Sequence, residues 1–196
     1  MNPRKNPRAS SALATLLLSL LALPACVGYA TWPPVNGTEN ATFTQINYVP
    51  APEIIAEAVL RVSLRYTPAA EMDRGEVYQG PIALSLPPGA SAATYRLITS
   101  RVGPNFEPAT EANAELPTYY VTRVNIRSTV AEIDVLAPAP RFGATGQDRY
   151  QLVSVNLAGG TQPWRVMSHR AYPVGMFPLP ARNTIPAEID PLTTLR

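Results

Sequence analysis

The chain has 196 residues, of which 46% are hydrophobic and 15% are charged, so it is long enough for one domain with a buried core. Its single cysteine excludes an internal disulfide framework and a cysteine-based zinc site. Its 22 prolines exclude long uninterrupted helices.

The first 26 residues have the three parts of an export signal. Basic residues precede an apolar run over residues 12–22, which is too short to span a bilayer. The next residues, Leu23, Pro24, Ala25 and Cys26, resemble the lipobox of bacterial lipoproteins. This resemblance covers residues 1–26 alone, and it implies that Cys26 is acylated and becomes the new N-terminus. Two alternatives remain open: ordinary secretory cleavage after Ala25 or Ala30, and an uncleaved anchor.

The resemblance also implies a location and a partner. A lipid on Cys26 would attach the protein to a membrane of the bacterial cell envelope. The residue after the cysteine is Val27 rather than Asp, which favours the outer membrane. Ordinary cleavage would instead give a secreted or periplasmic soluble protein. After processing, 13 basic and 14 acidic residues remain, so net charge gives no case for a nucleic-acid partner.

Composition divides the rest of the chain into three parts. Residues 27–50 are rich in Gly, Pro, Asn and Thr and predict a flexible tether. Residues 51–172 carry periodic hydrophobic segments and predict one domain. Residues 173–196 are rich in proline and predict an extended tail that lies on the domain.

The domain begins with a segment that permits two interpretations. Pro52 and Glu53 suit a helix start, and Ile55, Val59 and Val62 recur on one helical face. Residues 58–67 also alternate between apolar and polar, as a strand would. We expect a helix, with the strand as the alternative.

The next segments are better delimited. Residues 82–86 predict a short strand that ends at two prolines. Ser91 is typical of a helix N-cap, and Gly103 with Pro104 ends that helix. Residues 103–117 predict a loop.

A hairpin is predicted over residues 118–127 and 130–136. Folding the chain about residues 128–129 sets Val124 opposite Ile133 and Arg123 opposite Asp134. The same register sets Ile126 opposite Ala131, Asn125 opposite Glu132 and Thr122 opposite Val135. Further strands are predicted over residues 150–157 and 164–172.

The chain carries no sequence motif for a specific reaction. His169 is the only histidine, and its neighbour Ser168 points to the opposite side of a strand, so we expect no catalytic role for His169. Glu132 and Asp134 could be paired acids, although a charge pair between Asp134 and Arg123 explains Asp134 as well. An aromatic group in the β-rich half (Tyr119, Tyr120, Tyr150, Trp164 and Tyr172) predicts sheet packing, with an aromatic ligand-binding face as the alternative.

Together these segments predict an α+β fold with a mainly antiparallel sheet of four to five strands and two helices packed on it. An all-β sandwich is the alternative if residues 58–67 form a strand. We expect a non-enzymatic, lipid-anchored envelope protein without cofactor or metal, which acts as a structural or accessory interaction module on another envelope protein. The alternatives are a small-ligand-binding lipoprotein with a pocket between helices and sheet, and a divergent hydrolase.

Overall fold

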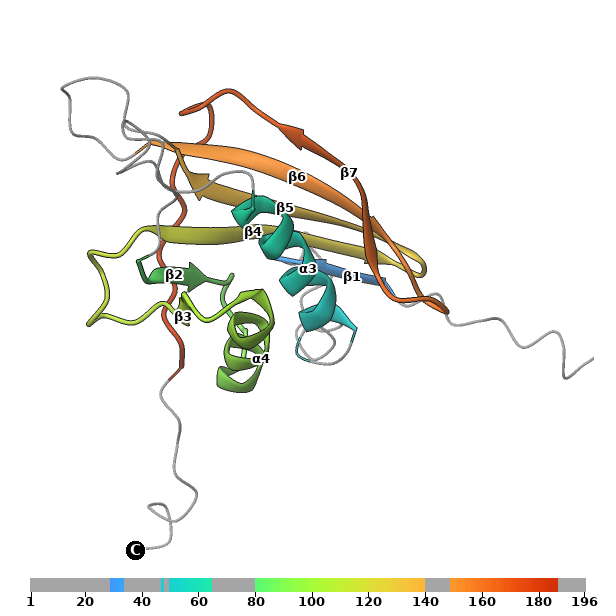
Figure 1. Cartoon of the computed structure of the whole chain (residues 1–196), viewed down its shortest axis with the longest axis horizontal. Coiled ribbons are helices and arrows are strands. Elements are labelled where there is room, and N and C mark those ends of the chain that lie inside the picture. The colour runs from blue at the N-terminus through green and yellow to red at the C-terminus, as the bar shows by residue number, and fades with distance from the viewer. Residues whose placement is uncertain (1–28, 34–46, 48–49, 65–79, 140–148, 187–196) are drawn as a thin grey trace, which may run out of the picture.

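The computed structural model describes residues 29–33, 47, 50–64, 80–139 and 149–186, so Cys26 and the predicted signal lie outside the described residues. Within the described residues, two helices and a seven-stranded sheet form an α+β fold, as predicted. The helices α3 (Ala51–Ser63) and α4 (Ala92–Val102) lie in front of the sheet in Figure 1, and the C-terminal segment, residues 173–186, passes behind it.

The sheet is larger than predicted and is mixed rather than mainly antiparallel. Its order is β3-β2-β4-β5-β6-β7, and β1 pairs with β4 outside this path. Strand β2 runs parallel to both β3 and β4, because α4 forms the crossover that a parallel pair needs. The strands are β1 (Tyr29–Trp32), β2 (Ile82–Ser85), β3 (Phe106–Pro108), β4 (Thr118–Arg127), β5 (Val130–Pro138), β6 (Tyr150–Ala158) and β7 (Arg165–Ala171).

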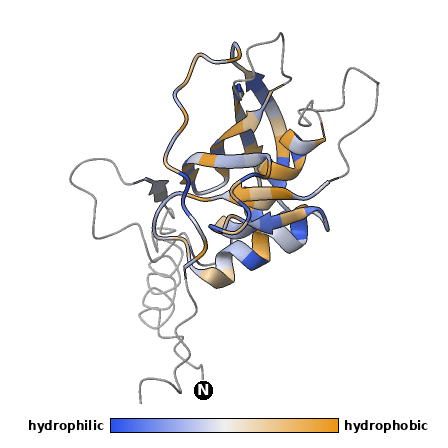
Figure 2. Cartoon of the chain, turned by 90° about the vertical axis from the view of Figure 1, so that its left-hand side faces the viewer, coloured by the Kyte–Doolittle hydropathy of each residue, from blue (hydrophilic) through white to orange (hydrophobic). Residues whose placement is uncertain are grey.

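Helix α3 resolves the ambiguous segment in favour of a helix, which rules out the strand interpretation for residues 58–63. Pro52 lies in its first turn, as predicted, and Ile55, Val59 and Val62 are fully buried. These side chains pack against the sheet and form the main core with residues of β4, β5 and β6. The mixed colours along each helix in Figure 2 reflect this amphipathic pattern.

Helix α4 begins where the sequence predicts. The Ser91 hydroxyl accepts a hydrogen bond from the Thr94 backbone N–H at 3.1 Å, and the helix ends at Gly103, whose φ is 151°. The following loop was predicted to continue to residue 117. Instead, residues 106–108 form β3, a strand of three residues that includes Pro108 and is too short to show a period in the sequence.

The β4–β5 hairpin confirms most of the predicted register, including Val124 with Ile133 and Arg123 with Asp134. The pairing of Thr122 with Val135 is wrong, because Val121 takes that place. A β-bulge between residues 121 and 123 leaves Thr122 as the extra residue.

Strand β1 lies inside the segment predicted as a flexible tether. Tyr29–Trp32 pairs antiparallel with the second half of β4. Trp32 is fully buried, and its indole N–H donates to the Pro88 carbonyl at 2.8 Å. The tether prediction is therefore wrong for these four residues, because pairing and burial of Trp32 fix them to the sheet.

The C-terminal segment extends the domain past its predicted boundary at residue 172. The Asn183 side chain donates to the Leu86 carbonyl at 3.0 Å, and its backbone N–H donates to the Ser85 hydroxyl at 3.0 Å. The Ile185 N–H donates to the Ala109 carbonyl at 2.8 Å. The segment is extended, as its prolines predict, and these bonds fasten it across the ends of β2 and β3.

Candidate functional site

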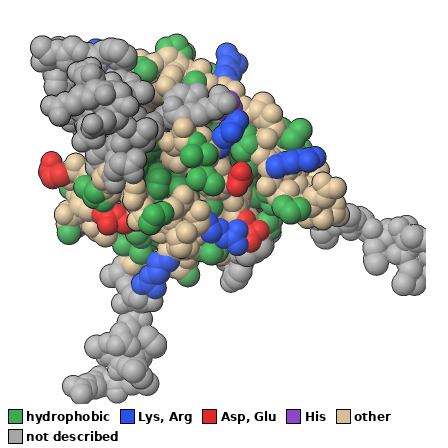
Figure 3. All heavy atoms as spheres, in the orientation of Figure 1, with side chains coloured by type: hydrophobic (Ala, Val, Ile, Leu, Met, Phe, Trp, Pro, Cys, Tyr) green, Lys and Arg blue, Asp and Glu red, His purple; other side chains and the backbone are tan. Residues whose placement is uncertain are grey.

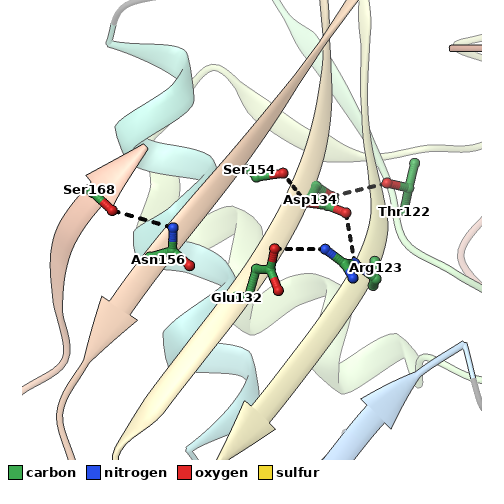
Figure 4. Close-up of polar contacts among 7 residues, drawn as sticks. All are labelled: Thr122, Arg123, Glu132, Asp134, Ser154, Asn156 and Ser168. Carbon is green, nitrogen blue, oxygen red and sulfur yellow. Dashed lines mark hydrogen bonds and ion pairs between the residues drawn. The ribbon is translucent and has the colours of Figure 1, made fainter. Parts of the chain in front are cut away.

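The two faces of the sheet differ in character. On the helix-facing side, alternate residues of β4, β5 and β6 belong to the main core. The other side, here the outer face, carries a row of polar residues across four neighbouring strands (Figure 4). We name these residues the outer-face cluster: Thr122, Arg123, Glu132, Asp134, Ser154, Asn156 and Ser168.

Asp134 is the centre of this cluster. Only 8% of the residue is exposed, and its carboxylate accepts hydrogen bonds from Arg123 Nε at 2.8 Å and from the Ser154 hydroxyl. The Thr122 hydroxyl donates to the Asp134 backbone carbonyl at 3.3 Å. A buried carboxylate requires hydrogen-bond partners, so the bonds from Arg123 and Ser154 explain why an acid is tolerated inside the sheet.

Arg123 connects the buried acid with an exposed one. Its second contact is an ion pair between Nη2 and Glu132 Oε1 at 2.8 Å. Partial burial of Arg123 disfavours its charged form, but the hydrogen bonds and charges of Asp134 and Glu132 outweigh this and raise its pKa. Both carboxylates are thus engaged by one guanidinium. The predicted charge pair between Arg123 and Asp134 is confirmed, and the arrangement gives no support to paired catalytic acids.

His169 lies on β7 opposite Val155, a core residue, and is half-buried. Ser168 lies on the outer face, where its hydroxyl accepts a hydrogen bond from Asn156 Nδ2 at 3.3 Å. The two neighbours therefore point to opposite faces and form no nucleophile–base pair. Among the residues that the structure describes, no group of three or more His, Cys, Asp or Glu side chains could hold a metal ion.

A surface hollow of about 220 Å³ lies at a break in the pairing of β4. Strand β2 pairs with β4 up to Tyr120, and β1 pairs with it from Val124, so neither strand pairs with residues 121–123. The hollow occupies this break, and prolines supply much of its wall. Its lining is Pro33, Ser85, Leu86, Pro87, Pro88, Tyr120, Val121, Thr122, Pro180, Ala181 and Asn183. No pattern in the sequence indicates this hollow, because its walls come from segments that lie far apart in the chain.

The aromatic residues of the β-rich half are divided between the two faces. Tyr119 lies in the main core, edge-on to Phe106, and Trp164 packs against the same core. Tyr120 and Tyr150 form an edge-on pair on the outer face, where they belong to a second apolar cluster with Tyr172. This arrangement is ordinary sheet packing, as predicted, and it does not form a single aromatic face.

Comparison with known proteins identifies no relative: no protein-family model, no curated protein and no solved structure matches the chain. Among the described helices, neither is long and apolar enough to cross a membrane.

Proposed function

We propose that the chain is a lipid-anchored protein of the bacterial cell envelope, attached through Cys26, that acts as an accessory interaction module for another envelope protein. The outer membrane is the favoured location. The anchor is supported by the lipobox-like residues 23–26. The function is non-enzymatic in this proposal and needs no cofactor or metal.

One observation carries the interaction role: the polar side chains are placed on the outer face of a rigid sheet rather than in an enclosed pocket. The helix–sheet interface is filled by fully buried side chains such as Ile55, Ile98 and Ile133. The outer-face cluster is held in fixed geometry by its own ion pairs, and the Glu132 side chain is 38% exposed. Pre-organised polar groups on strands suit recognition, because little conformational entropy is lost when a partner docks.

Site-specific photocrosslinking in the cell tests this role. A photoreactive residue at Ser168, exposed on β7, should give a discrete crosslinked product, whereas one at Ser100, exposed on α4, should not. Glu132→Arg should abolish the product, because it reverses an accessible charge of the cluster and removes its ion pair with Arg123. Equal crosslinking at both positions, or a product that survives Glu132→Arg, would contradict the proposal.

The anchor is tested separately by metabolic labelling with an alkynyl fatty acid. Wild-type protein should take up the label, and Cys26→Ser should not. An unlabelled wild-type chain would contradict the anchor and leave the secreted or periplasmic alternative.

The second candidate function is binding of a small ligand. The observation that favours it is the proline-lined hollow at the break in β4 pairing, not a pocket between helices and sheet. Its volume of about 220 Å³ is below the usual range for ligand sites of roughly 300–1,000 Å³, so the interaction role is preferred.

A further inference from the structure

Strand β1 brings the predicted lipid attachment site close to the folded domain. Only two residues separate Cys26 from Tyr29, the first residue of β1. Three Cα–Cα steps span at most about 11 Å. A lipid on Cys26 would therefore hold the start of β1 next to the membrane surface, instead of at the end of a long tether.

The pairing of the strands shows which part of the domain lies beside that point. Tyr29 pairs with Arg127, at the end of β4, so the β4–β5 turn is adjacent. Pairing then continues from Val130 to Ala158 and from Ala158 to Arg165, which brings in the β6–β7 loop. We name residues 127–130 and 158–165 the basic end; Figure 1 shows this turn and this loop together at the right-hand end of the sheet.

The basic end has the composition of a surface that contacts anionic lipid. Arg127 and Arg165 are both exposed, and the two segments contain no acidic residue. At the right-hand end of the face drawn in Figure 3, the coloured residues include basic and hydrophobic side chains but no acidic ones. Arginine side chains attract anionic headgroups over about one Debye length, so their local arrangement matters even though the processed chain has a net charge near zero.

Apolar and hollow features accompany these charges. Val130 is 52% exposed where the turn enters β5. Trp164 is half-buried and packs tightly over Gly159, where a Cβ would lie 2.5 Å from the indole ring. Between turn and loop lies a hollow of about 270 Å³ whose lining includes Thr129, Thr161 and Arg165. Hydroxyls beside a guanidinium are suited to bind phosphate oxygens.

We propose that the basic end docks on anionic phospholipid headgroups, so that the lipid on Cys26 and this surface together fix the domain against the membrane. The proposal rests on the proposed lipidation. A single weak contact suffices, because the anchor makes docking an intramolecular event at high effective concentration. The orientation that results turns the long axis of β4 and β5 away from the membrane and leaves the outer-face cluster accessible to a partner.

Tryptophan fluorescence of the purified lipidated protein in vesicles tests this docking. The vesicles contain acyl-brominated phosphatidylcholine, either alone or with phosphatidylglycerol in roughly equal parts. The chain has two tryptophans, and Trp32 is fully buried, so a Trp164→Phe variant reports the background quenching. We expect Trp164 to be quenched in the anionic vesicles and the quenching to decrease as salt is added.

Charge variants test whether Arg127 and Arg165 cause the docking. Each arginine near an anionic surface is expected to change the docking equilibrium about fivefold, so Arg127→Gln with Arg165→Gln should weaken it roughly 25-fold. Arg149→Gln is the matched control, since Arg149 is an exposed arginine just before β6, at the opposite end of the sheet. Circular dichroism of each variant checks that it folds as the wild type does.

The outcomes separate this proposal from the anchor. Quenching that is the same in wild type and Trp164→Phe, or unchanged in the double arginine variant, would overturn docking by the basic end. Mass spectrometry of the N-terminal peptide decides lipidation independently. If Cys26 carries no lipid, the anchor fails, and docking, which needs the anchor for its effective concentration, fails with it. If Cys26 carries the lipid but the double arginine variant is quenched like the wild type, docking by the basic end alone is overturned.

Discussion

Asp134 and Glu132 share one arginine but differ in burial, which makes them a matched pair. Asp134 lies in the sheet and also binds Ser154, whereas Glu132 is exposed to solvent. Asp134→Ala should lower the free energy of unfolding by about 2 kcal/mol, because it leaves buried donors without an acceptor. Glu132→Ala should cost about 0.5 kcal/mol or less, as exposed ion pairs do.

Double-mutant cycles with Arg123→Ala, measured by urea unfolding, separate the two contacts. We expect a coupling energy of about 1 kcal/mol or more for Arg123 with Asp134, and about 0.3 kcal/mol for Arg123 with Glu132. Equal couplings would show that burial of Asp134 does not strengthen its ion pair.

Two buried tyrosines predict a loss of stability at alkaline pH. Desolvation raises the pKa of Tyr119, and it raises that of Tyr95 in spite of the opposing hydrogen bond to Leu86 and charge of Arg182. In the unfolded chain tyrosine ionises near pH 10, while the folded protein retains the proton. The contribution is therefore fully present below about pH 10 and is lost as pH rises towards the folded pKa values.

Urea unfolding at a series of pH values checks this expectation. The free energy of unfolding should fall above about pH 10, and Tyr119→Phe should make the fall shallower because one of the two groups no longer ionises on unfolding. Comparison at about pH 8, where tyrosine is protonated in both states, isolates any packing effect of the substitution. If the free energy of unfolding of Tyr119→Phe falls as steeply with pH as that of the wild type, groups other than Tyr119 cause the loss of stability.

At the scale of the elements, the sequence predicts what local chemistry determines. The Ser91 cap, the apolar face of α3 and the β4–β5 register follow from residues close together in the chain, so their positions were predictable. The bulge at Thr122 could not be predicted. Threonine is tolerated on either face of a strand, so the local sequence does not show where the register between β4 and β5 shifts.

The sequence also does not predict features that are determined by pairing with residues far along the chain. Strand β1 has four residues and no clear period, and its partners in β4 lie far along the chain. The buried run of β2 predicts a strand but not its direction, which the α4 crossover determines. The hollow beside Pro33 needs the docked end of β1, and the basic end needs the pairing of β5 with β6, so neither could be derived from the sequence.

At the scale of the whole molecule, the C-terminal segment forms a layer of its own. Phe177 packs edge-on against Tyr172 over the outer apolar cluster. Arg182 donates to the Thr110 and Asn113 carbonyls and to the Asn113 side chain, which fastens the loop before β4. The sheet is thus covered by helices on one face and, at one end, by this segment on the other (Figure 1).

This layer leads to a prediction about truncation. A chain ending at residue 172 loses the aromatic cover and the hydrogen bonds of Arg182, Asn183 and Ile185, whereas a chain ending at residue 186 keeps every one of these contacts. At roughly 1 kcal/mol for each lost bond, in addition to the exposed apolar surface, the shorter chain should lose about 3 kcal/mol or more of its unfolding free energy. Urea midpoints measure the difference, and Arg182→Lys, which cannot reproduce the planar guanidinium contacts, should fall between the two chains. If both truncated chains unfold at the same urea concentration, residues 173–186 do not stabilise the sheet, and the domain ends with β7 as the sequence alone predicts.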